Sequence, residues 1–176
     1  KYILTVQGEG RGHMTQALSM YDLLIENGHT VCAVLLGSSG SRDIPKFFFE
    51  KIKAPIIQLQ SPNFVTDKNN KSINVTKSVL HNFRKLKTFK GSLKTIDALM
   101  KEHQPDVVIN FFDLLIGLYY RFYKPTAKMI CIAHQYIYFY PDFEFPEGRW
   151  LDKEAIKFFT RLTATRSSKN LALSFY

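Results

Sequence analysis

The residues best suited to chemistry form a glycine-rich stretch near the start of the chain. Three glycines alternate with one acidic and one basic residue: Gly8, Glu9, Gly10, Arg11 and Gly12. His13 follows them directly. Glycines let a backbone turn tightly and approach a ligand, and the start of a helix presents free N–H groups that attract an anion. A neutral imidazole is suited to removing a proton near neutral pH. The pattern therefore predicts an anion-binding loop, to which Arg11 adds charge, beside a histidine suited to proton transfer.

Asp113 is a second residue suited to chemistry, at the end of a predicted strand. It stands directly after the apolar run 107–112, which is typical of a buried strand. An aspartate that accepts one imidazole N–H fixes the tautomer of the ring and stabilises its charged form. Asp113 can equally cap a helix that begins at Leu114, so both interpretations stay open.

The elements that must position these residues alternate between strands and helices. Apolar runs predict strands at 2–6, 31–36, 56–59, 107–112, 129–133 and 171–175. Apolar side chains at three- and four-residue spacing predict helices at 14–25, 44–51, 76–102, 114–123 and 151–167. Such alternation implies an α/β fold, namely a doubly wound, Rossmann-like parallel sheet with helices on both faces. The segments predicted as loops are the polar residues 61–72 and the aromatic residues 136–150.

In a doubly wound sheet the second and fifth strands lie on opposite sides of the first. Cys32 and Cys131 fall on those two strands, so we expect buried, reduced thiols and no disulfide. Ligands bind at the carboxyl ends of parallel strands. His134 and Gln135 follow the fifth strand and are therefore candidates for contacting an acceptor, although a buried structural histidine is an equal alternative.

The glycine loop differs from the dinucleotide fingerprint G-x-G-x-x-G. Its spacing is G-x-G-x-G, and His13 stands where the third glycine would fall. The second strand ends in Leu36-Gly37-Ser38, without the acidic residue that holds the ribose hydroxyls. Both differences count against a Rossmann-type NAD(P)-binding oxidoreductase domain, which is the first alternative. Binding of NAD(P) to residues 1–176 would favour it.

The beginning of the chain resembles the GT-B glycosyltransferases. The likeness rests on GEGRGH at 8–13, the amphipathic helix after it, and Asn27-Gly28-His29-Thr30-Val31. It is a likeness to the UDP-sugar-dependent families, including the bacterial lipid-linked N-acetylglucosaminyltransferases and small-molecule glucosyltransferases, and it is clearest over residues 1–37. One residue differs, because many members carry proline three residues after the histidine and this chain has Gln16.

The resemblance implies transfer of a sugar, with inversion, from a UDP-sugar to an acceptor hydroxyl. His13 would be the base, Asp113 its orienting aspartate, and the loop 8–12 would approach the diphosphate. Residues 1–176 would form the N-terminal, acceptor-side domain, with the C-terminal donor-binding domain absent and the fragment inactive alone. No cofactor is expected besides the nucleotide-sugar co-substrate, and no metal, because helix dipoles can stabilise the leaving group.

The chain carries a large positive charge. It has 24 Lys and Arg against 15 Asp and Glu, a net charge of +9, which attracts nucleic acid, anionic membranes or phosphorylated ligands. The helix 76–102 interleaves apolar residues with basic ones, which is typical of a helix packed on a sheet and of one lying on a membrane. These basic residues are Lys77, Arg84, Lys85, Lys87, Lys90 and Lys94. The aromatic segment 136–140 can contact a sugar or a lipid, or pack between domains. The acceptor is therefore expected to be a lipid or a small molecule.

A non-catalytic anion- or nucleic-acid-binding module is the second alternative. No recognised nucleic-acid motif accompanies the charge, so no nucleic-acid partner is expected. The longest apolar stretch, 107–120, is shorter than the roughly 20 residues of a membrane span. The chain opens on a strand pattern rather than on a leader. We therefore expect a cytoplasmic protein, at the inner face of the membrane if the acceptor is a lipid.

Overall fold

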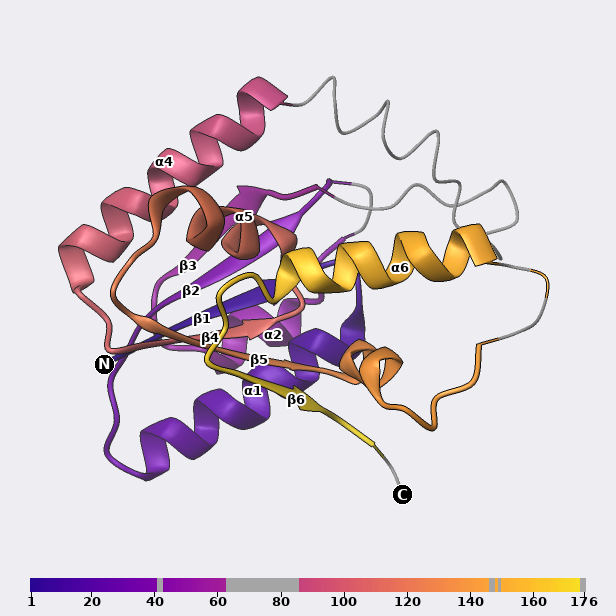
Figure 1. Cartoon of the computed structure of the whole chain (residues 1–176). Helices are drawn as coiled ribbons and strands as arrows, with labels where there is room; N and C mark the ends of the chain where they lie inside the picture. Colours follow the sequence, from indigo (N-terminus) through magenta and orange to yellow (C-terminus); the bar gives the residue numbers. More distant parts are fainter. Residues whose placement is uncertain (41–42, 63–85, 146–147, 149, 175–176) are drawn as a thin grey trace.

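The computed structural model describes residues 1–40, 43–62, 86–145, 148 and 150–174. Its elements alternate along the chain (Figure 1): β1 (Tyr2–Gln7), α1 (Arg11–Glu26), β2 (Val31–Ser38), α2 (Lys46–Lys51), β3 (Ile56–Gln60), α4 (Leu86–His103), β4 (Val107–Phe111), α5 (Leu114–Tyr123), β5 (Lys128–Ala133), η1 (His134–Phe139), α6 (Trp150–Thr163) and β6 (Lys169–Ala172).

The strands form one six-stranded sheet in the order β3-β2-β1-β4-β5-β6, and every neighbouring pair is parallel. The predicted α/β, Rossmann-like class is therefore confirmed. So is the placement of β2 and β5 on opposite sides of β1. Cys32 and Cys131 are both free, as this order requires.

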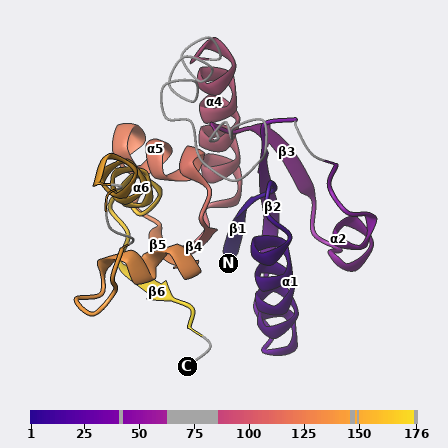
Figure 2. The same ribbon diagram turned by 90° about the vertical axis from the view of Figure 1, so that its right-hand side faces the viewer.

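Helices cover both faces of the sheet. Successive strand residues point to opposite faces, so Leu4 and Val6 join the apolar cluster under α1 and α2, while Ile3 joins the cluster under α4 and α5. Figure 2 shows the same layers: α4, α5 and α6 lie on one side of the strands and α1 and α2 on the other.

Helix α1 begins earlier than its apolar stripe indicates. It starts at Arg11, after an N-cap Gly10 in an extended conformation, and ends before Gly28, whose φ is +74°. Residues at three- and four-residue spacing from Met14 to Leu24 face the core. The early start places His13 in the first turn, where its side chain is buried.

Helix α4 packs on the sheet. Phe89, Ile96 and Met100 are buried, and they join the cluster on that face. The basic residues on the described part of α4 are exposed: Lys87, Lys90 and Lys94. Of the two interpretations of this basic helix, the sheet-packed one is confirmed for the described part. Lys77, Arg84 and Lys85 lie outside the described residues.

Two predicted loops have a different outcome. The start of the aromatic segment forms the 3-10 helix η1 rather than a loop, because it turns directly out of the end of β5. Of the predicted loop 61–72, Ser61 and Pro62 are buried and the remaining residues lie outside the described part, which begins again at residue 86. Within the described ranges, no helix is long and apolar enough to cross a membrane.

Gly117 allows α5 and α6 to cross at close range. A Cβ at this position would clash with the carbonyl oxygen of Leu162 and lie 3.0 Å from Cα of Thr163. Both are backbone atoms, which cannot move away without displacing α6. The contact therefore depends on the absence of a side chain at Gly117.

We expect Gly117→Ala to lower the melting temperature of the protein by several degrees, since overpacking of this kind costs about 1–3 kcal/mol. The matched control is Gly91→Ala, at an exposed position of α4 where an added Cβ meets nothing within 4 Å. Alanine favours a helix over glycine by about 0.5–1 kcal/mol, so the control should melt at a higher temperature. Thermal unfolding followed by circular dichroism measures both, and a shift in the same direction would contradict the assignment.

Candidate functional site

The glycine loop is tied to the end of β2. The Gly8 N–H donates to the carbonyl oxygen of Gly37 at 2.7 Å. Glu9 Oε1 accepts from the backbone N–H of Ser39 at 2.7 Å and from its hydroxyl at 2.6 Å. Glu9 was expected in a diphosphate-binding loop, but its carboxylate is engaged in holding two loops together.

The three glycines of the loop have different surroundings. A Cβ on Gly8 would lie 3.0 Å from the Gly37 carbonyl oxygen, and one on Gly10 would lie 3.3 Å from Cδ2 of His13. A Cβ on Gly12 would meet nothing within 4 Å. Gly8 and Gly10 therefore allow close packing, while Gly12 faces open space at the start of α1.

Arg11 lines a pocket beside this loop. The pocket has a volume of about 700 Å³ and opens between the start of α1 and the ends of β2 and β3. Lys46 supplies a second cation and Asp43 an anion to its lining. The described residues thus place two basic side chains next to the open start of α1.

His13 is only 8% exposed, and it is enclosed by residues from three elements. The Phe112 ring stacks on the imidazole, with 5.6 Å between the ring centroids and 16° between the planes. The side-chain nitrogen of Gln135 lies 3.4 Å from Nε2 of His13. Burial lowers the pKa of His13 to about 4, and the neighbouring Gln16 side chain opposes that shift. The ring is therefore neutral at physiological pH, which is the form that can accept a proton.

Asn110 holds the turn that presents Phe112 to His13. Its Oδ1 accepts from the Asp113 N–H at 2.8 Å and from the Thr5 hydroxyl at 3.0 Å. Its Nδ2 donates to the Asp113 carbonyl at 3.1 Å and to the Thr163 carbonyl at 2.9 Å. The sequence analysis did not identify Asn110 as part of the site. A single amide within an otherwise apolar, buried strand was the signal that could have found it.

The predicted hydrogen bond between Asp113 and His13 is not formed. Asp113 Oδ2 accepts from the Ser61 hydroxyl at 2.8 Å, and Oδ1 accepts from the Ile116 N–H at 3.2 Å. Nδ1 of His13 is buried and has no hydrogen-bond partner among the described residues. Asp113 is therefore the cap of α5, which was the alternative interpretation, and Gly37 leaves room for its carboxylate because a Cβ there would clash with Oδ2. Burial raises the pKa of Asp113 to about 6.

The two candidates after β5 separate in the structure. Gln135 points to His13, as described above, whereas His134 is exposed and its Nδ1 is 2.9 Å from the carbonyl oxygen of Leu173. His134 is thus neither a buried structural histidine nor in contact with His13. The residues that come together at the carboxyl edge are His13, Phe112 and Gln135.

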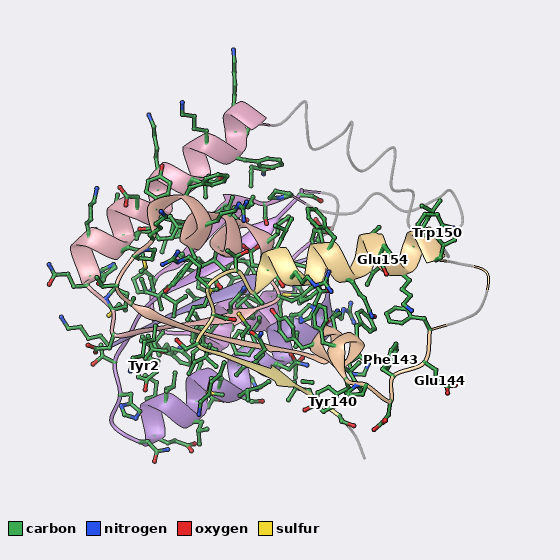
Figure 3. All side chains as sticks on the ribbon, in the orientation of Figure 1. Tyr2, Tyr140, Phe143, Glu144, Trp150 and Glu154 are labelled. Carbon is green, nitrogen blue, oxygen red and sulfur yellow. The ribbon has the colours of Figure 1, made fainter. Side chains whose placement is uncertain are left out.

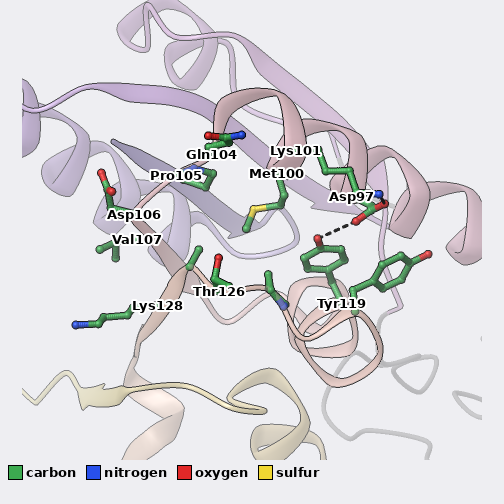
Figure 4. A pocket seen from close by; sticks show the side chains of 13 residues that line it. Asp97, Met100, Lys101, Gln104, Pro105, Asp106, Val107, Tyr119, Thr126 and Lys128 are labelled. Carbon is green, nitrogen blue, oxygen red and sulfur yellow. Dashed lines mark hydrogen bonds and ion pairs between the residues drawn. The ribbon is translucent and has the colours of Figure 1, made fainter.

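A larger pocket lies at the opposite edge of the sheet. It has a volume of about 910 Å³ and includes Val107 and Lys128, which begin β4 and β5 (Figure 4). One of its carboxylates, Asp97, accepts from the Tyr119 hydroxyl at 3.1 Å and from Lys101 Nζ at 2.7 Å. These three groups of the lining are thus paired with one another, and the edge is the amino-terminal one, where parallel sheets rarely bind ligands. Across the described ranges, no group of His, Cys, Asp and Glu could hold a metal ion.

Comparison with known proteins gives a match over the whole chain. The family model described as "Glycosyl transferase family 1" matches residues 1–176. Among solved structures, the crystal structure of Arabidopsis thaliana UGT89C1 complexed with UDP is similar at 17% identity with a TM-score of 0.46, over 99% of this chain and 42% of that one. The chain therefore spans less than half the length of that protein. No curated protein matches it.

Burial gives His13 and Asp113 opposite effects on the pH dependence of stability. The pKa of His13 falls from 6.5 to about 4, so the unfolded state binds the extra proton and stability rises with pH across that window. The pKa of Asp113 rises from 3.8 to about 6, so the folded state binds the extra proton and stability falls as pH rises. The two contributions, each about 3 kcal/mol, oppose one another in the parent protein.

Single variants should separate these contributions. Asp113→Asn keeps an oxygen for the cap and leaves only the contribution of His13. We therefore expect its free energy of unfolding to increase with pH between pH 4 and 6.5 more steeply than that of the parent. His13→Gln leaves only the contribution of Asp113, so we expect its free energy of unfolding to decrease as pH rises from 4 to 6, in contrast to that of the parent. Urea denaturation at a series of pH values measures both. Equal slopes for the two variants would show that neither group titrates as its burial requires.

Proposed function

Since the chain belongs to glycosyl transferase family 1, we propose that the full-length protein transfers a sugar from a nucleotide-sugar to an acceptor hydroxyl. UDP is the nucleotide that the resemblance of residues 8–31 favours. Residues 1–176 would be the N-terminal, acceptor-side domain, with the donor held mainly by a C-terminal domain outside this chain. The observation that carries the proposal is the buried, neutral imidazole of His13 in the first turn of α1, at the carboxyl edge of the sheet.

In the proposed reaction His13 accepts the proton of the acceptor hydroxyl. The acceptor oxygen attacks the anomeric carbon as the O–H bond breaks and a nitrogen–proton bond forms on the ring. The bond from that carbon to the diphosphate breaks, the nucleoside diphosphate leaves with the electron pair, and the configuration inverts. Burial, to which the stacked ring of Phe112 contributes, lowers the pKa of the imidazole, so the base is unprotonated when an acceptor arrives.

The start of α1 is the group that we expect to face the diphosphate. The first backbone N–H groups of a helix have no partner within the helix, and they carry a partial positive charge. An added Cβ on Gly12 would meet nothing, so a ligand can approach the backbone there. Arg11 and Lys46 add two charges beside this point. Glu9 and Asp113 are left out of this role, because their carboxylates have partners within the protein.

His13→Ala in the full-length protein should lower the rate of sugar transfer by about 10²- to 10⁴-fold, the usual contribution of a general base. His29→Ala is the matched control, because His29 follows the opposite end of α1 and its ring lies tilted against that of Tyr2. The control should transfer at the parent rate. Transfer by His13→Ala at the parent rate would show that His13 is not the general base.

Nucleotide titration by calorimetry tests the domain assignment. We expect UDP to bind the full-length protein and not residues 1–176 alone, because the main donor-binding surface would lie outside this chain. GDP in place of UDP would change the donor and leave the two-domain proposal intact. Binding of NAD to residues 1–176 would instead identify the glycine loop as a dinucleotide site.

If the acceptor is a lipid, we propose that α6 rather than α4 meets the membrane. Phe89, Ile96 and Met100 of α4 are buried, whereas Trp150, Leu151 and Phe158 on α6 are 68%, 63% and 62% exposed. In Figure 3 Trp150 stands at the free end of α6. An apolar, exposed helix face flanked by cations is typical of a helix that lies on an anionic bilayer.

The cations of this surface lie on the same helix and over neighbouring aromatic rings. Lys153 and Lys157 lie 5.4 and 5.2 Å from the centroid of the Phe145 ring, and Arg161 lies 5.4 Å from that of Phe139. Cation–π contacts hold these charges beside apolar groups, where they can meet lipid phosphates while the aromatic rings enter the interface.

Charge reversal on the two helices tests this placement. We expect the triple variant Lys153→Glu, Lys157→Glu and Arg161→Glu to lose about 100-fold in affinity for vesicles of phosphatidylglycerol and phosphatidylcholine, since each basic contact is worth about 1 kcal/mol. The matched control carries the same charge change on α4: Lys87→Glu, Lys90→Glu and Lys94→Glu. Co-sedimentation of the full-length protein measures both, and equal losses would mean that net charge rather than α6 governs binding.

A further inference from the structure

The two nitrogens of the His13 ring have different surroundings. Nε2 faces the side-chain nitrogen of Gln135 at 3.4 Å. An amide nitrogen is only a donor, so this contact is favourable when Nε2 carries a lone pair and the ring proton sits on Nδ1. A proton-bearing Nδ1 needs an acceptor, because an unpaired buried donor costs about 1–3 kcal/mol.

The acceptor that the sequence suggested for Nδ1 is engaged elsewhere. Both oxygens of Asp113 have donors, from Ser61 and from the first turn of α5. Three buried side-chain atoms without a hydrogen bond remain in the described part of the chain: His13 Nδ1, Gln16 Oε1 and Gln135 Oε1. Two of them, on His13 and Gln16, belong to residues three apart on α1, which are neighbours on one face of a helix.

We propose that Gln16 is the positioning residue of His13, and that its side-chain oxygen accepts the Nδ1 proton and leaves Nε2 free to receive the proton of the acceptor. This inference rests on the proposed function for its catalytic consequence. The Gln16 side chain raises the pKa of His13 against the effect of burial, which places it near the ring, while Nδ1 of His13 and Oε1 of Gln16 are not hydrogen-bonded to one another in this structure. A proline at this position, as in many of the families that the loop resembles, could not supply such an oxygen.

A neutral amide has a particular consequence for a base. It fixes one tautomer and one ring orientation without adding the negative charge that an aspartate would bring. The ring thus stays neutral and ready to accept a proton, while the amide oxygen still stabilises the imidazolium that forms. Gln135 donates to Nε2 at the position where an acceptor hydroxyl would donate, so we expect substrate to displace its amide.

Histidine-selective ¹⁵N NMR on the full-length protein measures the tautomer directly, with the His13 signals assigned by their loss in His13→Gln. We expect the parent to carry its proton on Nδ1. Gln16→Met, which keeps the side-chain shape and removes the amide, should give a mixture of tautomers and lower kcat by about 10- to 100-fold with little change in KM, as loss of an orienting partner does. Gln16→Glu, which retains an acceptor oxygen, should keep the parent tautomer.

Two further variants separate this role from a general structural one. Asp113→Asn should leave the His13 tautomer unchanged, because Asp113 is the cap of α5. Gln104→Met makes the same chemical change after α4, at an exposed position at the opposite edge of the sheet, and should leave both tautomer and kcat unchanged. A tautomer that changes in Asp113→Asn and not in Gln16→Met would overturn the proposal. Because the NMR measurement needs no turnover, it can succeed even if His13→Ala shows that the proposed transfer reaction is wrong.

Discussion

The arrangement of the site depends on the buried amide of Asn110. Four of its hydrogen bonds join β1, the turn after β4 and the end of α6. The turn needs this support because Phe112 has a φ of +62°, a conformation that costs a residue other than glycine roughly 1 kcal/mol or more. Without the amide, the strained turn would relax, and Phe112 and Asp113 would lose the positions from which one covers His13 and the other caps α5.

Burial has opposite effects on the pKa values of the two ionisable groups at this edge, His13 and Asp113. The Phe112 ring and the helix itself remove His13 from water, which lowers its pKa and keeps the imidazole neutral. The same burial raises the pKa of Asp113, whose carboxyl group is occupied by Ser61 and the start of α5. The sequence predicted that the Asp113 carboxylate would bond to His13, but these partners occupy it. Gln16 is then the side chain that we propose to accept the Nδ1 proton. The proposed base is consequently oriented by an amide rather than by an acid.

Four of the nine glycines, Gly8, Gly10, Gly37 and Gly117, lie where a Cβ would crowd neighbouring atoms. Gly8 and Gly37 bring the ends of β1 and β2 together, Gly37 admits the Asp113 carboxylate, and Gly117 lets α5 cross α6. Only Gly12 in the loop leaves the backbone open to an incoming molecule. In the glycine-rich loop 8–12, Gly8 and Gly10 thus serve close packing. We expect an anion to contact the loop mainly at Gly12, in the first turn of α1.

The sequence by itself determined the order and type of nearly every described element, because apolar periodicity is a local property that survives in any tertiary context. That order also determined the parallel sheet and brought residues after β1, β4 and β5 to one edge. The tertiary structure decided which partner each polar side chain takes. Asp113 bonds to Ser61, which is distant in sequence, and its carboxylate fits beside Gly37 because that residue has no side chain. The spacing of residues along the chain could not predict that Asp113 would take these partners instead of His13. The tertiary structure also decided which apolar side chains are exposed. Helices α4 and α6 have similar amphipathic patterns. Packing on the sheet buries Phe89, Ile96 and Met100 of α4, whereas Trp150 and Phe158 of α6 stay in solvent.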